Sequence, residues 1–397
     1  MNPPYHFVEN IIKPLLRTHR LAVAGILAAV TSSLAAPVGF TVSPPETVMT
    51  SAQMKERGIR EFDTGIYMIA EREQCKWFST CSKTPEGQTI SVGPRDEPFS
   101  YLAECGVQIE GLPNRRIDRD YAGNFGWFAN VYDIGNGHVL GFVHCEESMK
   151  DRTANSVEER AKDHPNPARG AGVYFRFGLA LSRDGGRHWQ WLGYILEPEL
   201  SLRDWYMGAK ANINIGYANY ILKDGWFQVY YRDSHWVDGV VKDGVAVMRA
   251  KVDDVVRAAE AGKVTMWHKY HDGEWSEPGI GGKFTPLNIP TRGLMHGDAA
   301  YNSYLKKYIL VTRGHKWEAV NKSEVQMTTS DDGLTWSDWQ VLYQDKHLND
   351  YPTIITTGDN SEVTGKEFYV YYLKHHDRIM PEKFGQVRFD RVKVTLD

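Results

Sequence analysis

The stretch from Leu179 to Trp191 reads LALSRDGGRHWQW, and a second stretch from Met327 to Trp339 reads MTTSDDGLTWSDW. Runs of alternating apolar residues flank both, which indicates a tight turn between two antiparallel strands. In such a turn an Asp carboxylate accepts hydrogen bonds from backbone amides, Gly allows positive φ, and Trp packs onto the next strand. The shared positions are Ser182, Asp184, Gly186 and Trp189 in the first copy, and Thr329, Asp331, Gly333 and Trp336 in the second.

The spacing of the two copies predicts a repeating architecture. They begin 147 residues apart, at Ser182 and Thr329, and one strand-rich stretch without the pattern lies between them. If two repeats cover that distance, each is about 73 residues long, and the chain after residue 36 holds about five. We therefore predict an all-β fold: a single β-propeller with five four-stranded antiparallel blades, with six blades as the alternative.

The last repeat shows only three strand patterns, in YPTIITTGDN, EFYVYYLKHHD and VRFDRVKVTLD. A propeller blade needs four strands. We expect a strand from the beginning of the chain, such as Thr64 to Ala70, to complete this blade.

Residues 1–36 have the pattern of a secretory signal peptide. Three basic residues between positions 13 and 20 precede an apolar run from Leu21 to Val30, and small residues follow up to Ala36. A retained membrane anchor is the alternative, but the run is short for a membrane span. We expect a secreted or periplasmic protein, without integral membrane contact once the signal is removed. An N-terminal extension would then occupy residues 37–60, and the catalytic propeller residues 61–397.

Composition restricts the class of partner. Loss of residues 1–36, which contain three basic residues and one glutamate, changes the formal net charge from −4 to −6. A mildly acidic surface argues against nucleic acid. The 12 Trp, 21 Tyr and 15 Phe suit the cores of sheets, and aromatic faces also suit the stacking of sugar rings.

All four cysteines, Cys75, Cys81, Cys105 and Cys145, follow the signal segment. An even number in an exported chain suggests disulfides. Cys75 with Cys81 would close a short loop, and Cys105 with Cys145 would join the first two blades, but spacing does not choose among the three pairings. A zinc site is disfavoured because no CxxC pair is present.

Polar and aromatic residues recur where loops lead into the first strand of a blade and where they leave its second strand. These loops open on the same face of a propeller, so we predict a shared site at its mouth. The two Asp turns fall on the opposite face. The candidate catalytic residues are Asp120, Glu146, Asp298, His144 and His296. The candidate substrate-binding residues are Arg119, Trp205, Tyr231, Arg232, His235, Trp236, Arg292, Arg313, Asp350 and Tyr351.

Glycoside hydrolysis requires two carboxyl groups on either side of the scissile bond, one protonated and one ionised. Asp120, Asp298 and Asp350 are candidates for the ionised partner. Glu146 is the candidate acid, because the apolar run Val139 to Val143 leads to it and partial burial raises the pKa of a carboxyl group. The arginines of the predicted site would hold a carboxylate or hydroxyls of the sugar.

With its two Asp boxes, at 182–189 and 329–336, the chain resembles the sialidase-like and five-bladed glycosidase propellers. The resemblance implies a secreted glycoside hydrolase that acts on a poly- or oligosaccharide at the mouth. Arg116-Ile117-Asp118 lacks the proline of the sialidase Arg-Ile-Pro motif, which argues against sialic acid as the substrate. The three-carboxylate pattern of arabinanase-like propellers is not matched position by position, so those roles are not carried over.

Two other functions fit the same residues. A polysaccharide lyase would use His and Tyr as base and acid with Arg to neutralise a uronate, and the candidates are His144, His296, Tyr231 and Arg232. A glycan-binding propeller without catalysis is the other. No ligand motif requires a metal or cofactor, although a metal ion on the axis is compatible with the sequence.

Overall fold

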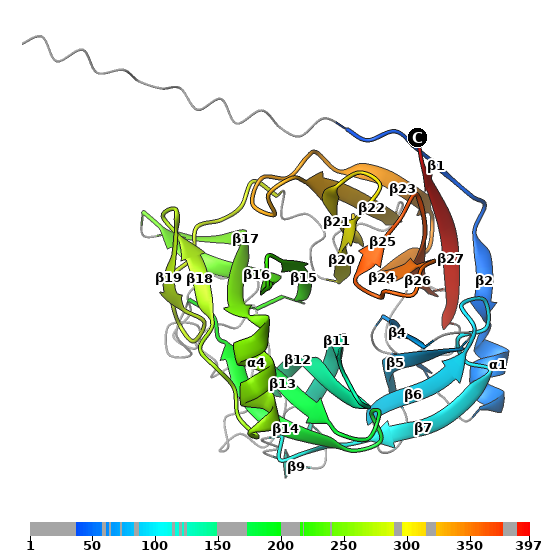
Figure 1. The fold of residues 1–397 in the computed structure, drawn as a ribbon, viewed down its shortest axis with the longest axis horizontal. Coiled ribbons are helices and arrows are strands. Elements are labelled where there is room, and N and C mark those ends of the chain that lie inside the picture. The colour runs from blue at the N-terminus through cyan, green and yellow to red at the C-terminus, as the bar shows by residue number, and fades with distance from the viewer. Residues whose placement is uncertain are drawn as a thin grey trace, which may run out of the picture. The chain divides into compact units, whose positions relative to one another are not determined.

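The computed structural model describes residues 37–57, 61–62, 65–71, 74–82, 87–112, 116–118, 121–122, 125–148, 173–199, 215–216, 218–238, 240–289, 296–314, 323–375 and 387–397. Five mainly antiparallel sheets surround a common axis in this part of the chain (Figure 1). The first long strand of each sheet lies nearest the axis, and later strands lie farther out. The protein is a five-bladed β-propeller, which confirms the predicted fold class.

The first sheet contains β3 (Glu61–Phe62), β4 (Tyr67–Glu71), β5 (Gln74–Ser82), β6 (Gly87–Gly93) and β7 (Tyr101–Val107). The second contains β8 (Ile109–Glu110), β11 (Phe125–Gly135), β12 (His138–Ser148), β13 (Val173–Ser182) and β14 (Trp189–Leu196). The third contains β15 (Asn219–Lys223), β16 (Trp226–Val237), β17 (Val240–Lys251), β18 (His268–His271) and β19 (Glu274–Pro278).

The fourth sheet contains β20 (Gly297–Asn302), β21 (Lys307–Arg313), β22 (Ser323–Ser330), β23 (Gln340–Asp345) and β25 (Val363–Thr364). The fifth contains β1 (Phe40–Val42), β2 (Glu46–Met49), β24 (Leu348–Thr356), β26 (Glu367–His375) and β27 (Val387–Leu396). Outside these sheets, the described residues also form a small hairpin of β9 (Arg116–Asp118) and β10 (Tyr121–Ala122), and the short helices α1 (Ser51–Glu56) and α4 (Val252–Glu260).

The fifth sheet is completed by the N-terminal strands and not by Thr64–Ala70. Strand β1 pairs with β27 from Phe40 opposite Leu396, and β2 continues along the same strand from Glu46 opposite Arg391. The segment expected to fill this place instead supplies β4, the inner strand of the first sheet. The added strands cover the backbone donors and acceptors of β27, which would otherwise form an exposed sheet edge.

The first Asp turn has the predicted hydrogen bonds. Ser182 ends β13, and its Oγ accepts a hydrogen bond from the Gly186 amide at 2.7 Å. Asp184 Oδ1 accepts hydrogen bonds from the Ser182 hydroxyl and from the backbone amide of His188, both at 2.9 Å. The carboxylate therefore holds the turn closed between β13 and β14.

The second turn uses the neighbouring aspartate. Ser330 ends β22, its Oγ accepts from the Gly333 amide at 2.8 Å, and Asp332 Oδ1 accepts from the Leu334 and Thr335 amides at 2.7 Å. Asp331, the sequence-predicted acceptor, is exposed and forms an ion pair with Lys307. The prediction was wrong by one residue because this turn has one residue fewer between its serine and its tryptophan than the first turn has.

The tryptophan of each turn fills the space between two sheets. Trp189 of the second sheet packs edge-on against Phe78 of β5 in the first sheet, with ring centroids 6.3 Å apart, and Trp336 packs edge-on against Tyr230 of β16 at 5.4 Å. The turn glycines have positive φ, and a Cβ on Gly186 would lie 2.6 Å from the ring of Phe78. Glycine is therefore required both for the backbone conformation and for the close approach of the first sheet.

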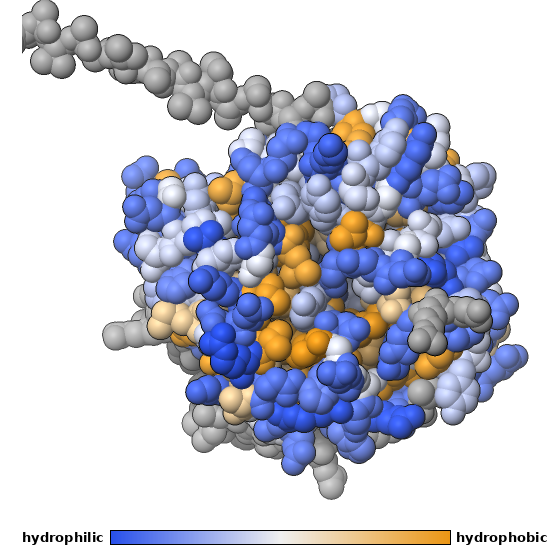
Figure 2. All heavy atoms as spheres, viewed as in Figure 1, coloured by the Kyte–Doolittle hydropathy of each residue, from blue (hydrophilic) through white to orange (hydrophobic). Residues whose placement is uncertain are grey.

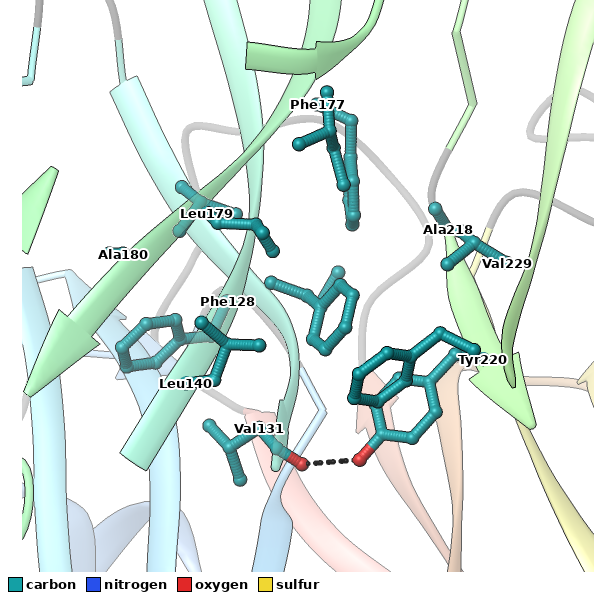
Figure 3. Packing of buried hydrophobic residues seen from close by; sticks show 14 of the residues in the cluster. Phe128, Val131, Leu140, Phe177, Leu179, Ala180, Ala218, Tyr220 and Val229 are labelled. Carbon is teal, nitrogen blue, oxygen red and sulfur yellow. Dashed lines mark hydrogen bonds between the residues drawn. The ribbon is translucent and has the colours of Figure 1, made fainter. Parts of the chain in front are cut away.

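Aromatic and aliphatic side chains fill the space between the second and third sheets (Figure 3). Phe128, Leu140 and Phe177 come from the second sheet, and Tyr220 and Val229 come from the third. On the face of the propeller that carries α4, hydrophobic side chains gather at the centre of the view and hydrophilic ones surround them (Figure 2).

The structure shows no disulfide among the cysteines whose side chains it describes, Cys75, Cys105 and Cys145. The predicted pairing of Cys105 with Cys145 is not formed, because Cys105 lies on the outermost strand of its sheet and Cys145 lies on the second strand of the next. The side chain of Cys81 and the predicted signal segment 1–36 are outside the described residues. Within the described residues, no helix is long and apolar enough to span a bilayer.

The two turns give a prediction with an internal control. Asp184→Ala and Asp332→Ala should each lower the free energy of unfolding by about 1–2 kcal/mol, because each removes a charged acceptor from backbone amides. Asp331→Ala should change it by less than about 0.5 kcal/mol, because its ion pair is exposed. Chemical denaturation of the three variants measures these differences. Equal losses for Asp331→Ala and Asp332→Ala would contradict the assignment.

Candidate active site

Several predicted site residues meet where the inner strands begin. His296 directly precedes β20, Asp298 lies in it, and Asp350 lies near the beginning of β24. Arg313 ends β21, whose Thr312 pairs with Gly297, so it returns to the same end of the sheet. We call His296, Arg313, Asp350 and Tyr351 the mouth cluster.

Asp350 is the charged centre of the mouth cluster. Its carboxylate is 1% exposed, and its Oδ2 accepts a hydrogen bond from Arg313 Nη1 at 2.6 Å. Its Oδ1 lies 2.6 Å from His296 Nδ1 and accepts the Tyr351 amide at 2.9 Å. Burial alone would raise the pKa of Asp350, but the charge of Arg313 and the contacts with His296 lower it below its ordinary value. Asp350 is therefore ionised and holds the ring of His296 in one orientation.

A β-bulge places Tyr351 over His296. The pairing of β24 with β26 shifts register between Asp350 and Thr353, and Tyr351 has φ of +51°. The two rings stack with centroids 4.0 Å apart and an angle of 13° between their planes. A non-glycine residue in the left-handed region is strained, and bulges of this kind often redirect side chains at functional sites.

Asp298 lies in the interior and is held by three N–H donors. Its Oδ1 accepts hydrogen bonds from Asn130 Nδ2 at 3.0 Å and the Ala299 amide at 2.9 Å, and its Oδ2 accepts the Ile354 amide at 3.0 Å. The side chain is 5% exposed. Burial raises the pKa of Asp298 to about 7, although all three donors favour the ionised form. This carboxyl group is therefore poised to exchange a proton near neutral pH.

Three histidines near these carboxyls are uncharged at neutral pH. Burial, with the nearby His296, lowers the pKa of His144 to about 4. Burial also lowers the pKa of His296 and of His375, although the charge of Asp350 opposes both shifts. The contact with Asp350 at Nδ1 fixes the orientation of the His296 ring.

Two other candidates contact residues outside the mouth cluster. Tyr231 is fully buried, and its ring packs against Phe284 at 6.4 Å. Arg232 forms an ion pair with Asp243 at 2.5 Å. Both residues lie in β16 of the third sheet.

The remaining candidates are outside the description. Arg119, Asp120, Trp205 and Arg292 lie outside the described residues. The backbones of Glu146, His235 and Trp236 are described as parts of β12 and β16, but their side chains are not. The role predicted for each of these residues stays a prediction.

Three residues near the axis were missed by sequence reasoning. Asn130 bridges to Asp298 from β11, and Tyr67 of β4 is a buried phenol whose pKa is raised by burial and then by Asp298. Asn219 begins β15 and is 2% exposed, and neither polar atom of its side chain has a hydrogen-bond partner within the described structure. A polar residue within an otherwise apolar inner strand was the sequence signal that could have identified these three residues.

The part of the chain that the structure describes contains no group of three or more His, Cys, Asp or Glu arranged to hold a metal ion. The arrangement offers instead a proton-exchanging carboxyl group, a neutral oriented imidazole and a stacked aromatic ring.

Comparisons with known proteins show what this chain is similar to. No protein-family model and no curated protein matches the sequence. Among solved structures, the catalytic domain of a GH62 α-L-arabinofuranosidase from Coprinopsis cinerea has a TM-score of 0.49 and 8% identity over 90% of this chain and 97% of that chain. A family 117 glycoside hydrolase from Zobellia galactanivorans has a TM-score of 0.47 and 9% identity, covering 85% of each chain.

A third similar structure is an N-acetylgalactosamine deacetylase from F. plautii in complex with blood group B trisaccharide. It has a TM-score of 0.46 and 10% identity over 85% of this chain and 90% of that chain. Similarities at such low identity concern the fold and assign no residue of this site.

The buried charges of the mouth cluster give a stability prediction. Asp350→Asn should lower the free energy of unfolding by about 3–5 kcal/mol, because it leaves Arg313 buried without its counter-charge. It should also lower the pKa of His296 further, since Asp350 supports the imidazolium. Denaturation and histidine NMR titration measure the two effects.

The control for this prediction is Glu71→Gln, which breaks the more exposed ion pair with Lys76 and should cost less than about 1 kcal/mol. A similar small cost for Asp350→Asn, or an unchanged pKa of His296, would contradict the assigned charge state of the cluster.

Proposed function

We propose that the protein is a secreted carbohydrate-active enzyme, a glycoside hydrolase that acts on a poly- or oligosaccharide at the mouth of the propeller. The observation that carries the proposal is the position of Asp298. This carboxyl group, whose pKa is raised, lies in β20, directly after His296 of the mouth cluster. The two turns with their Asp carboxylates support the resemblance to sialidase-like propellers, but they lie on the other face and take no part in the chemistry.

Asp298 is assigned the role of the ionised carboxylate. It accepts three N–H groups, and its Oδ2 accepts only one of them within the described residues, so one lone pair remains for a water proton or for attack on the sugar. A base with a pKa near 7 has the greatest catalytic value at neutral pH. The acid remains the sequence-predicted Glu146, which lies near the same end of β12 as His144.

The mouth cluster suits a neutral sugar. His296 is neutral because burial lowers its pKa, and Tyr351 lies stacked on it with an aromatic face of the kind that packs against sugar rings. Arg313 is engaged by Asp350, so it does not neutralise a carboxylate on the substrate. This favours hydrolysis of a neutral glycan over elimination from a uronate.

A polysaccharide lyase is the second candidate, and one observation favours it. An imidazole that is neutral and oriented by a carboxylate is suited to remove a proton from carbon next to a uronate, and Tyr351 lies against it. Its cation would have to come from Arg119 or Arg292, which lie outside the described residues.

The product of the reaction decides among the functions. The purified protein is incubated with a panel of neutral and uronate-containing polysaccharides, with Asp298→Asn as the test variant and Asp331→Asn, on the opposite face, as the matched control. We expect new reducing ends without an unsaturated-sugar absorbance, a loss of about 10²–10⁴-fold in turnover for Asp298→Asn, and full activity for the control.

An absorbance from an unsaturated sugar would show that the protein is a lyase and not a hydrolase. Glycan binding without any product would show that the protein binds glycans without catalysis. Full activity of folded Asp298→Asn would remove Asp298 from the mechanism.

The pKa of Asp298 also predicts a pH profile. As an ionised base it should give kcat/KM that rises with pH through about 7. Asn130→Leu removes a donor that favours the ionised form, so it should raise the pKa of Asp298 and move this limb to higher pH. Activity that falls as pH rises through 7, or a limb unmoved in Asn130→Leu, would contradict the role. Thermal melting at both ends of the range controls for unfolding.

A further inference from the structure

A third carboxyl group, besides Asp350 and Asp298, lies near the other end of the axis, away from the mouth cluster. Glu362 belongs to the connection between β24 and β26, and its Oε1 is 2.9 Å from the hydroxyl oxygen of Tyr220 on β15. The same hydroxyl lies 2.8 Å from the backbone carbonyl oxygen of Val131 on β11, the contact drawn in Figure 3. Tyr220 is 1% exposed, and Glu362 is partly buried.

The number of hydrogens at this junction determines who donates. A phenol has one hydrogen, and a backbone carbonyl only accepts, so the Tyr220 hydrogen is used by Val131. The short contact from Tyr220 to Glu362 then needs a hydrogen from the carboxyl group. We infer that Glu362 is a protonated carboxylic acid at neutral pH and donates a hydrogen bond to Tyr220, forming a proton-dependent brace between sheets.

The surroundings of Glu362 favour this proton. The titratable groups that face it are Tyr220 from β15, Asp298 from β20, and Asp133 and Tyr132 from β11, and no cation stands among them in the described structure. Burial raises the pKa of Glu362 to about 8. A hydrogen bond donated by Tyr220 would act against this shift, and the charges of Asp298 and Asp133 act with it. An ionised Glu362 would face two other carboxylates without a counter-charge.

The brace connects four of the five sheets. Val131 belongs to the second sheet and Tyr220 to the third, while the backbone oxygen of Glu362 accepts the Tyr301 amide of β20 in the fourth at 3.3 Å. Glu362 itself lies between two strands of the fifth, and the next residue begins β25, which pairs with β20. If Glu362 loses its proton, two acceptors compete for the single hydrogen of the Tyr220 hydroxyl. The hydrogen bond of Tyr220 with either Val131 or Glu362 is then lost.

The proton dependence has a defined sign. A carboxyl whose pKa rises on folding stabilises the fold fully below its unfolded pKa, and this contribution is lost as pH rises through the folded pKa. For Glu362 the window runs from its ordinary value of 4.5 to about 8. The brace therefore weakens in mild alkali, whatever reaction the mouth carries out.

Glu362→Gln tests the inference, because a glutamine side chain keeps a hydrogen-bond donor that does not titrate. Melting temperatures are measured from pH 5 to pH 9 for the wild type, for Glu362→Gln, and for Asp359→Asn, an exposed carboxylate in the same connection, as control. At pH 5 the wild type should melt at or above Glu362→Gln, and by pH 9 Glu362→Gln should melt higher. Asp359→Asn should follow the wild type. A difference between wild type and Glu362→Gln that is constant, or that grows in favour of the wild type with pH, overturns the inference.

Infrared spectroscopy gives a second test that does not depend on the folding of Glu362→Gln. The wild type at pH 7 should show the C=O band of protonated carboxyl groups, which disappears by pH 9. Asp298, with a pKa of about 7, also contributes to this band, so the part assigned to Glu362 is the part that responds to Tyr220. In Tyr220→Phe, which removes the acceptor, this band should move to higher frequency. A wild type without the band, or a band unmoved in Tyr220→Phe, overturns the inference. Neither result depends on whether the protein hydrolyses a glycan.

Discussion

The carboxylate of Asp298 accepts hydrogen bonds from three of the five inner strands, and the centre of the propeller depends on this junction. Asn130 comes from β11, Ala299 from β20 itself and Ile354 from β24. Sheets that pack face to face do not otherwise satisfy a buried charge at the axis, and a buried charge without partners is costly. The same contacts hold the carboxyl group in one orientation, which is what a catalytic base requires. Stability and proposed chemistry therefore rest on one side chain.

The fold could be predicted from the sequence because its decisive signals are local. The serine, glycine and tryptophan of the first turn, and the strand patterns around it, act within about ten residues of one another. The errors occurred where two local solutions compete or where distant segments meet. Asp331 and Asp332 are adjacent and chemically identical, and only the length of the turn decides which one accepts the amides. The strand that completes the last sheet comes from residues 40–49, more than 300 residues from its partner in sequence.

The sequence named each residue of the mouth cluster as a candidate, but it did not show how these residues contact one another. Loop and strand-end positions indicated His296, Arg313, Asp350 and Tyr351, because polar residues gather there. Their sequence did not show that Asp350 serves both Arg313 and His296, or that a bulge turns Tyr351 onto the imidazole. The Tyr220–Glu362 contact joins residues 142 positions apart, and no local pattern marks it. Contacts between side chains of different sheets form only when the propeller is closed, and the sequence pattern of a single strand does not show which strands will meet.

Three buried carboxyl groups along the inner strands and their connections solve the same electrostatic problem in different ways. Asp350 has a guanidinium against it, so it stays ionised even in acid. Asp298 accepts three N–H groups, which act against burial so that its pKa lies near 7. Among the described residues, neither a cation nor a set of amides lies beside the carboxyl group of Glu362, which faces two carboxylates, so the remaining way to bury it is to keep its proton. The partners of each carboxyl group thus decide its charge. Asp298, whose pKa lies between those of the other two, is the group that can change its charge at neutral pH. Asp298 can therefore take up or release a proton near neutral pH at little cost in free energy, and a pKa near the working pH is the one that suits a group in proton transfer.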